Sequence, residues 1–140
     1  MSEQENVRIV QDAYAAFESG DIPTVLNALT ADVEWEIPGP AQVPICGVRR
    51  GPKEVETFFR TLAETEDIQQ FEPRDFLAGG DKVAVIGHYR SQLRSTGAIS
   101  DMDWVHVFTL RGGKIASFRE FTDTLAVAKA YRVGLETAAT

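Results

Sequence analysis

Cysteine is almost absent from this sequence, because Cys46 stands alone among 140 residues, and an intrachain disulfide is therefore excluded. Histidine is nearly as scarce: there are two, and neither lies at metal-ligand spacing from the cysteine. A phosphate-binding loop and a G-x-G-x-x-G motif are missing as well, which removes the common nucleotide-binding signatures. We therefore expect no metal and no cofactor.

Positive charge is in the minority, with 14 Lys and Arg against 21 Asp and Glu and a net charge of −7. Nucleic acids and anionic membranes bind positive surfaces, so both are disfavoured as partners. No apolar run approaches the roughly 20 residues of a membrane-spanning helix. The N-terminal MSEQENVR lacks the pattern of a signal peptide. We expect a cytoplasmic protein.

What the chain does contain is enough apolar sequence for one core, since 44% of its residues are hydrophobic. Its length predicts a single domain spanning residues 1–140. Apolar residues at helical spacing predict a first helix that starts with a capping box at Ser2 and ends at Gly20. A second short helix follows an N-cap at Asp21, and a third starts near Pro52.

Strand patterns occupy most of the remaining sequence. Period-two alternation predicts a strand at 32–38, and prolines and glycines then predict a loop without regular structure at 38–51. From residue 68 onward, strands separated by glycine turns lead to a closing helix capped by Asp123 or Thr124. This order predicts an α+β domain in which helices cover one face of a curved antiparallel sheet.

The last two predicted strands form a hairpin whose register decides which side chains meet. A two-residue loop, Gly112-Gly113, would pair His106 with Arg119 and would send Glu120 to the opposite face. We favour a three-residue loop that includes Arg111, because it suits Gly113 in the left-handed conformation. One face then carries Trp104, His106, Phe108, Phe118 and Glu120, and the other carries Val105, Val107, Thr109, Ile115, Ser117, Arg119 and Phe121.

A carboxylate and an imidazole among aromatic rings are typical of a small-molecule site. A carboxylate buried there without a partner would cost several kcal/mol or become protonated. We expect Glu120 and His106 to be the catalytic residues and a small hydrophobic molecule to be the ligand. The expected ligand-binding residues are Tyr14, Trp35, Ile37, Phe58, Leu62, Tyr89, Trp104, Phe108 and Phe118.

Four segments, 13–39, 51–59, 96–97 and 104–124, together resemble the nuclear transport factor 2-like superfamily. The likeness is strongest to SnoaL-like polyketide cyclases and ketosteroid-isomerase-related proteins. It implies a cone-shaped α+β barrel with a pocket between the helices and the sheet. It also implies a homodimer that packs through the outer face of the sheet.

The resemblance assigns roles to particular positions. Polyketide cyclases and limonene epoxide hydrolase place a catalytic aspartate where this sequence has Glu120. The ketosteroid isomerase base corresponds to Ile37, its oxyanion-stabilising aspartic acid to His106, and its first-helix tyrosine to Ala13, beside Tyr14. The loss of that base disfavours steroid isomerisation by the known route.

Epoxide hydrolysis is disfavoured in the same way. The arginine and the second aspartate that this reaction needs correspond to Gly87 and Tyr89. The resemblance therefore implies a family and a fold more firmly than one reaction.

Three functions stay open at this point. The first is a cofactor-independent isomerase, cyclase or dehydratase that acts on a hydrophobic carbonyl compound. In this enzyme Glu120 is the general base, and His106 either stabilises an oxyanion or keeps Glu120 ionised. The second is a module that binds a hydrophobic ligand without chemistry. The third is a structural or interaction domain that uses the outer face of its sheet mainly for dimerisation, and it predicts a pocket filled by the protein's own side chains. Independently of these functions, Glu120 has a structural alternative, in which it reaches solvent or bonds to Trp104 or His106, and His106 has one as a satisfied core histidine.

Overall fold

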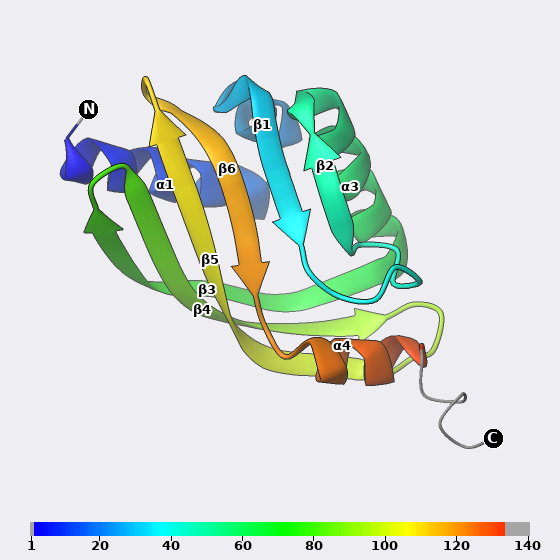
Figure 1. The fold of residues 1–140 in the computed structure, drawn as a ribbon. Coiled ribbons are helices and arrows are strands. Elements are labelled where there is room, and N and C mark those ends of the chain that lie inside the picture. The colour runs from blue at the N-terminus through cyan, green and yellow to red at the C-terminus, as the bar shows by residue number, and fades with distance from the viewer. Residues whose placement is uncertain (1, 134–140) are drawn as a thin grey trace.

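The structure is a computed structural model, and it describes residues 2–133 (Figure 1). These residues form four helices and six strands. In chain order they are α1 (Glu3–Glu18), α2 (Ile22–Asn27), β1 (Leu29–Ile37), β2 (Gly47–Arg50), α3 (Gly51–Thr65), β3 (Glu66–Gly79), β4 (Lys82–Leu93), β5 (Ile99–Arg111), β6 (Lys114–Phe121) and α4 (Thr124–Tyr131).

Helices α1, α2 and α4 begin where their capping residues predict. The Ser2 hydroxyl accepts a hydrogen bond from the Glu5 backbone N–H, and the Glu5 carboxylate accepts one from the Ser2 backbone N–H, which completes the capping box of α1. Asp21 caps α2 and Asp123 caps α4, each by accepting a backbone N–H three residues ahead. These side chains satisfy N–H groups that a helix leaves free in its first turn.

All six strands belong to one curved sheet in the order β2-β1-β6-β5-β4-β3. The α+β fold class is therefore confirmed. Two details differ from the expected antiparallel barrel: the sheet is open, and β1 runs parallel to β6. The meander from β3 to β6 is antiparallel throughout, but β1 precedes it in the chain and adds beside its last strand in the same direction.

The predicted loop at 38–51 contains a short strand, so the expectation of no regular structure there was wrong in part. Gly47–Arg50 forms β2, which pairs with β1 at the edge of the sheet. The prolines that argued against a strand end at Pro44. An edge strand needs only one partner, so four residues without proline are enough for it.

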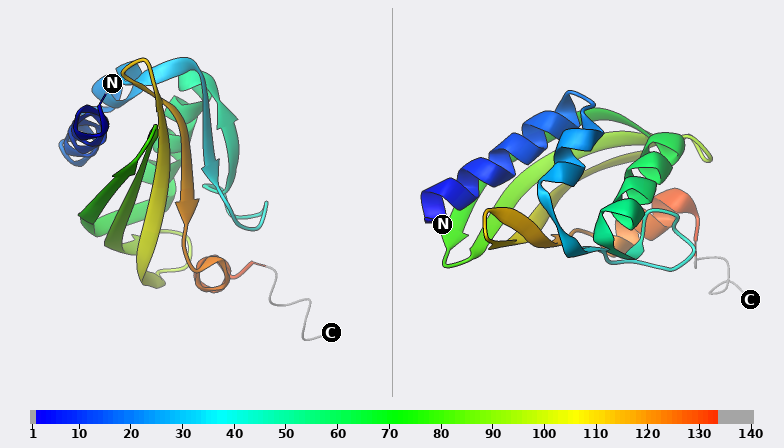
Figure 2. Two further views of the ribbon diagram at one scale, coloured as in Figure 1. Left: turned by 60° about the vertical axis from the view of Figure 1, so that its left-hand side comes forward. Right: turned by 90° about the horizontal axis from the view of Figure 1, so that it is seen from above.

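The helices lie on the concave side of the sheet, where α1 contacts β3 and β4 and α3 contacts β1 and β2 (Figure 2). The short helix α4 lies at one end of the strands and contacts β5 (Figure 1). None of the helices within residues 2–133 is long and apolar enough to cross a membrane. The cytoplasmic location stays a prediction.

The register of the β5–β6 hairpin differs from the expected one. Arg111 pairs with Lys114 across a two-residue turn, in which Gly112 and Gly113 both have positive φ, 59° and 81°. The three-residue loop was therefore wrong. One extra residue, Ala116, then shifts the ladder by one position, as a β-bulge does.

Because of this bulge, His106 and Glu120 still share one face of the sheet, as the three-residue loop had predicted. The two residues pair with each other across β5 and β6. Ile115 precedes the bulge, so it points inward, opposite to the expectation, and is fully buried. The turn and the bulge together place the imidazole and the carboxylate side by side.

Candidate functional site

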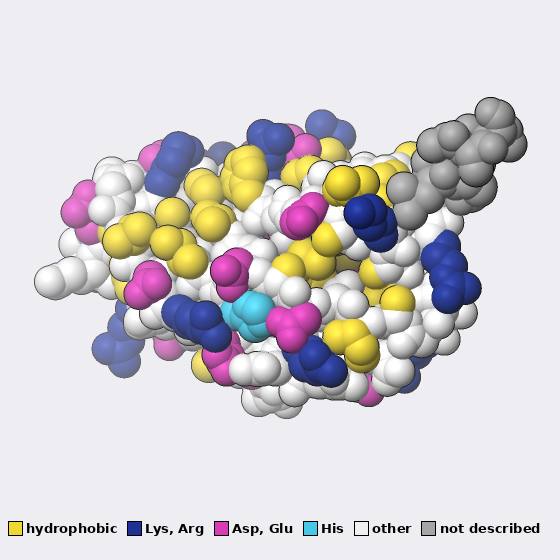
Figure 3. All heavy atoms as spheres, turned by 90° about the horizontal axis from the view of Figure 1, so that it is seen from below, with side chains coloured by type: hydrophobic (Ala, Val, Ile, Leu, Met, Phe, Trp, Pro, Cys, Tyr) yellow, Lys and Arg dark blue, Asp and Glu magenta, His cyan; other side chains and the backbone are white. Residues whose placement is uncertain are grey.

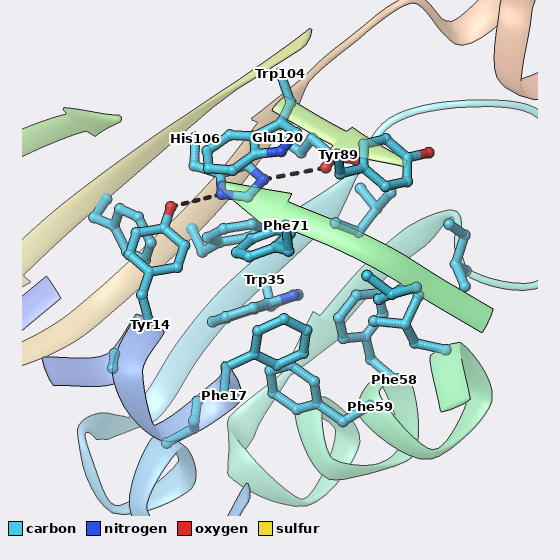
Figure 4. A pocket seen from close by; sticks show the side chains of 18 of the residues that line it. Tyr14, Phe17, Trp35, Phe58, Phe59, Phe71, Tyr89, Trp104, His106 and Glu120 are labelled. Atoms are coloured by element: carbon cyan, nitrogen blue, oxygen red, sulfur yellow. Dashed lines mark hydrogen bonds and ion pairs between the residues drawn. The ribbon is translucent and has the colours of Figure 1, made fainter. Parts of the chain in front are cut away.

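A cavity lies between the concave face of the sheet and helices α1 and α3 (Figure 4). It contains about 820 Å³ of space that no atom fills, its open mouth included. Every residue that the sequence singled out for a site lies in its wall, and their functional roles stay predictions. These residues are Tyr14, Trp35, Ile37, Phe58, Leu62, Tyr89, Trp104, His106, Phe108, Phe118 and Glu120.

Sequence reasoning missed part of the wall. Phe17 follows Tyr14 by three positions on α1. Phe59 precedes Leu62 by three positions on α3, so helical spacing could have found both phenylalanines. Ile45 shows that the loop before β2 closes one side of the cavity. The other missed residues are Ala13, Val25, Glu66, Ile68, Phe71 and Ile115.

His106 links two other polar side chains of the wall. The Tyr14 hydroxyl lies 2.7 Å from His106 Nδ1, and Glu120 Oε1 lies 3.1 Å from His106 Nε2 (Figure 4). These residues come from α1, β5 and β6, and 92 residues separate Tyr14 from His106 in the chain. The side chain of His106 is 6% exposed and that of Glu120 is 19% exposed. The carboxylate is therefore the member of this chain that reaches furthest toward solvent.

Burial sets the protonation of this hydrogen-bonded chain. Burial lowers the pKa of His106 below its ordinary value, although the hydrogen bond and charge of Glu120 act in the opposite direction. Burial raises the pKa of Tyr14, and the negative charge of Glu120 raises it further. The arrangement therefore favours a neutral imidazole and a neutral phenol beside a carboxylate.

The indole of Trp104 fixes the plane of the imidazole. The two rings are stacked with centroids 3.9 Å apart and planes inclined by 13°. The indole lies over Gly87 of the neighbouring strand, where a Cβ atom would come within 2.3 Å of Trp104 Cζ2. Only glycine leaves room for the indole at this position, so Gly87 has a structural role in the site.

Two hydrogen-bond donors in the wall have no acceptor. Trp35 Nε1 and Trp104 Nε1 are buried and lack a partner within the described residues. Both rings lie in the cavity wall, and in Figure 4 their nitrogen ends point toward the same side of it as the Glu120 carboxylate. A buried donor without an acceptor is uncommon, and a ligand oxygen would satisfy it.

The remaining chemically reactive groups are less well placed. Burial raises the pKa of Cys46 to about 11, so its thiol is a weak nucleophile. Within residues 2–133, no three His, Cys, Asp or Glu side chains are close enough together to hold a metal ion. The cavity wall thus offers a carboxylate, an imidazole, phenols and indoles, which suits proton transfer and hydrogen bonding.

The second histidine, His88, lies on the outer face of the sheet. It contacts Asp101 and, at 2.7 Å, Asp103, and Arg90 also binds Asp101. Figure 3 shows a histidine at the surface with acidic and basic side chains around it. The hydrogen bond to Asp103 is the main cause that raises the pKa of His88. This exposed cluster is separate from the cavity.

Comparison with known proteins places this geometry in a family. The model of the SnoaL-like domain matches residues 10–118. A nuclear transport factor 2-like protein of Burkholderia xenovorans LB400 is 39% identical, with a TM-score of 0.85 over 93% of this chain and 98% of that one. An uncharacterised protein of Mycobacterium tuberculosis is 28% identical over 122 residues, which are 86% of this chain and 91% of that protein.

One similar structure is that of a protein co-crystallised with a named small molecule. TerC, crystallised with polyporic acid, is 26% identical, with a TM-score of 0.81 over 91% of this chain and 98% of that one. The match of fold and sequence extends over nearly the whole of each compared chain. The chain belongs to the SnoaL-like domain family, within the nuclear transport factor 2-like superfamily.

Proposed function

We propose that this protein is a cofactor-independent proton-transfer enzyme for a small hydrophobic carbonyl compound, of isomerase, cyclase or dehydratase type. The observation that carries the proposal is the hydrogen-bonded chain Tyr14–His106–Glu120 in the wall of an aromatic cavity. A titratable group with a shifted pKa in such a cavity is a common sign of a catalytic site. The co-crystallisation of TerC with polyporic acid adds support for a small molecule in this fold.

Hydrogen bonding supports one tautomer of His106. A carboxylate only accepts hydrogen bonds, so His106 Nε2–H donates to Glu120, and Nδ1 accepts from the Tyr14 hydroxyl. Both ring nitrogens are then occupied. The geometry therefore favours His106 as a positioning residue that orients the Glu120 carboxylate, rather than as a donor to an oxyanion.

Glu120 is the general base of the proposed reaction. Its Oε1 accepts from His106, and no protein donor within residues 2–133 binds its Oε2. Oε2 is free to remove a proton from the carbon next to a carbonyl group. A positioned base of this kind contributes about 10²–10⁴-fold to a reaction rate.

The unpaired indoles support a carbonyl compound as substrate. When a carbon loses its proton, negative charge develops on the neighbouring carbonyl oxygen. The N–H groups of Trp35 and Trp104 have no acceptor within residues 2–133 and are enclosed by neighbouring atoms, so either one would stabilise that charge only after its ring turns toward the cavity. The aromatic wall favours a flat, apolar substrate skeleton.

The test is proton exchange in a panel of hydrophobic ketones. 2-Tetralone, whose α protons are acidic, is incubated with the protein in D₂O, and the loss of its α-proton NMR signals is followed. We expect faster exchange than in buffer, because Glu120 removes these protons. A ketone that raises Tm but exchanges at the rate in buffer would favour the binding module instead.

We also propose that two copies pair through the outer face of the sheet. Ile86, Val105 and Phe121 form a row across β4, β5 and β6 on that face. Ile86 and Phe121 are exposed although they are large and apolar. A contiguous exposed apolar patch is typical of a protein interface.

A further inference from the structure

Glu66 is a second carboxyl group in the wall of the cavity. It is the first residue of β3, directly after α3, and it is 4% exposed. The cavity that contains Glu120 is also lined by Glu66. Two acidic side chains, one from β3 and one from β6, therefore border the same cavity.

Two hydroxyl groups hold the Glu66 carboxyl in place. The Ser91 hydroxyl donates to Oε1 at 2.8 Å, and the Tyr131 hydroxyl donates to Oε2 at 2.5 Å. Ser91 belongs to β4 and is fully buried, and Tyr131 belongs to α4. Both oxygens are thus oriented by groups that remain neutral.

No cation balances a charge on Glu66. Within residues 2–133 it forms no ion pair, and Arg94, which follows its strand partner Leu93, donates instead to the backbone oxygen of Ala63. Tyr131 and Glu120 are the titratable groups that shift the pKa of Glu66, and Glu66 in turn raises the pKa of Tyr89 and Cys46; none of these groups is positive.

This environment differs from that of Glu120. Burial raises the pKa of Glu66, the hydrogen bonds from Tyr131 and Ser91 oppose the shift, and the negative charge of Glu120 adds to it. Glu120 in contrast accepts an N–H from His106, and its side chain is 19% exposed. Paired carboxyl groups whose surroundings differ in this way divide into an acid and a base in many enzymes.

We propose that Glu66 is the general acid of the same site and that it donates a proton to the substrate oxygen while Glu120 removes one from carbon. This inference rests on the proposed function. The Glu120 carboxylate takes the proton from the α carbon, and the electron pair of the broken C–H bond forms a C=C bond. The carbonyl oxygen takes the Glu66 proton, which leaves an enol, a Glu66 carboxylate and a protonated Glu120.

The return steps complete an isomerisation without any other reactant. Glu120 gives its proton to a carbon of the enol, the carbonyl group re-forms, and the enol proton returns to Glu66. The substrate is then a ketone that binds between the carboxyl groups of Glu66 and Glu120 and forms an enol there. Its oxygen points toward β3 and its acidic carbon toward β6.

The first measurement needs no substrate. Infrared difference spectra of wild type and Glu66→Gln identify the C=O band of a protonated Glu66 and its titration midpoint. We expect a midpoint above the ordinary value of a glutamic acid, because burial raises the pKa of Glu66. Glu120→Gln lowers this midpoint, because the repelling charge is gone, and Tyr131→Phe raises it, because a stabilising hydrogen bond is lost. A midpoint near the ordinary value of about 4.3 that does not respond to Glu120→Gln would overturn the inference.

The second measurement separates chemistry from structure. Exchange of the 2-tetralone α protons is expected to slow at least about 10²-fold in Glu66→Gln, because the amide has no acidic proton. The urea midpoint of unfolding should stay unchanged, because the amide keeps the shape of the side chain. Full-rate exchange in Glu66→Gln together with lost exchange in Glu120→Gln would reject Glu66 and keep the proposed function. Lost exchange in Glu66→Gln with full-rate exchange in Glu120→Gln would reject Glu120 as the base and keep Glu66 as the acid.

Discussion

Trp104 lies flat against His106, with ring centroids 3.9 Å apart and planes 13° from parallel. The stack fixes the imidazole from its face, while hydrogen bonds to Tyr14 and Glu120 fix it at its edge. An imidazole held in this way keeps both of its partners in place without rearrangement. The site therefore depends on a position outside its own hydrogen bonds, namely Gly87, which makes room for the indole.

Gly87→Ala is expected to disrupt this stack. The added Cβ would lie 2.3 Å from Trp104 Cζ2 and 2.6 Å from the backbone oxygen of Glu72, so the indole must move. Overpacking of this kind costs about 1–3 kcal/mol of the free energy of unfolding. Urea unfolding followed by Trp fluorescence measures it. Gly79→Ala is the matched control, since no atom lies within 4 Å of a Cβ there; equal stability of the two variants would contradict the packing account.

The two histidines should change the pH dependence of stability in opposite directions. His106 has a lowered pKa in the folded state, so below about 6.5 the unfolded chain binds the extra proton first, and stability falls as pH falls. Its slope approaches at most about 1.4 kcal/mol per pH unit. His88 has a raised pKa in the folded state. It therefore adds to the free energy of unfolding below about pH 6.5, and this contribution is lost as pH rises through its folded-state pKa.

Urea unfolding of His106→Asn and His88→Asn between pH 5 and 8 checks both signs. Relative to wild type, His106→Asn should flatten the loss of stability on the acidic side, and His88→Asn should flatten the loss on the basic side. The NMR titration of each imidazole in the wild type gives the same two directions independently. A raised pKa at His106 would contradict the assigned neutral ring.

The hairpin explains how sequence reasoning reached the right pair of residues by a wrong register. The Gly112-Gly113 pair is compatible with two turn types. The sequence around Ala116 did not indicate a bulge, because this bulge depends on packing across the sheet rather than on residue type. The aromatic residues of β5 and β6 nevertheless predicted which face is buried. The helices were predicted well, because their caps at Ser2, Asp21 and Asp123 are local signals.

Glu66 shows what sequence patterns cannot reveal. It follows a helix that ends in acidic and polar residues, where a solvated carboxylate is the ordinary expectation. Its burial depends on Ser91 and Tyr131, which are 25 and 65 residues away in the chain. The parallel pairing of β1 with β6 is equally non-local. Such features follow from the assembled fold and not from any short segment.

Trp35→Phe tests whether the unpaired indole recognises a ligand. The phenyl ring keeps the stacking on Phe118, whose centroid is 4.0 Å away, but removes a buried N–H that has no acceptor within residues 2–133. We expect unchanged or higher stability, with weaker binding of 2-tetralone by about 1–3 kcal/mol. Calorimetry and thermal unfolding measure the two effects. A loss of stability with unchanged binding would assign the indole to core packing alone.

A substitution at Val105, the central residue of the row Ile86, Val105 and Phe121, tests the proposed dimer through the outer face of the sheet. Val105→Glu places a charge between Ile86 and Phe121 and should convert a dimer to a monomer in size-exclusion chromatography with light scattering. Leu125→Glu, at an exposed apolar position on α4, is the control and should leave the mass unchanged. A monomeric wild-type protein at micromolar concentration would contradict the proposed interface.

The rate at which 2-tetralone loses its α protons to D₂O in the presence of Glu120→Gln tests the account most directly. The amide keeps the length of the side chain and can still bond to His106, but it cannot accept a proton, so the rate should fall by about 10²–10⁴-fold. Glu34→Gln, an exposed carboxylate on β1, should exchange like wild type. Exchange at the wild-type rate in Glu120→Gln would contradict the assignment of Glu120 as the general base.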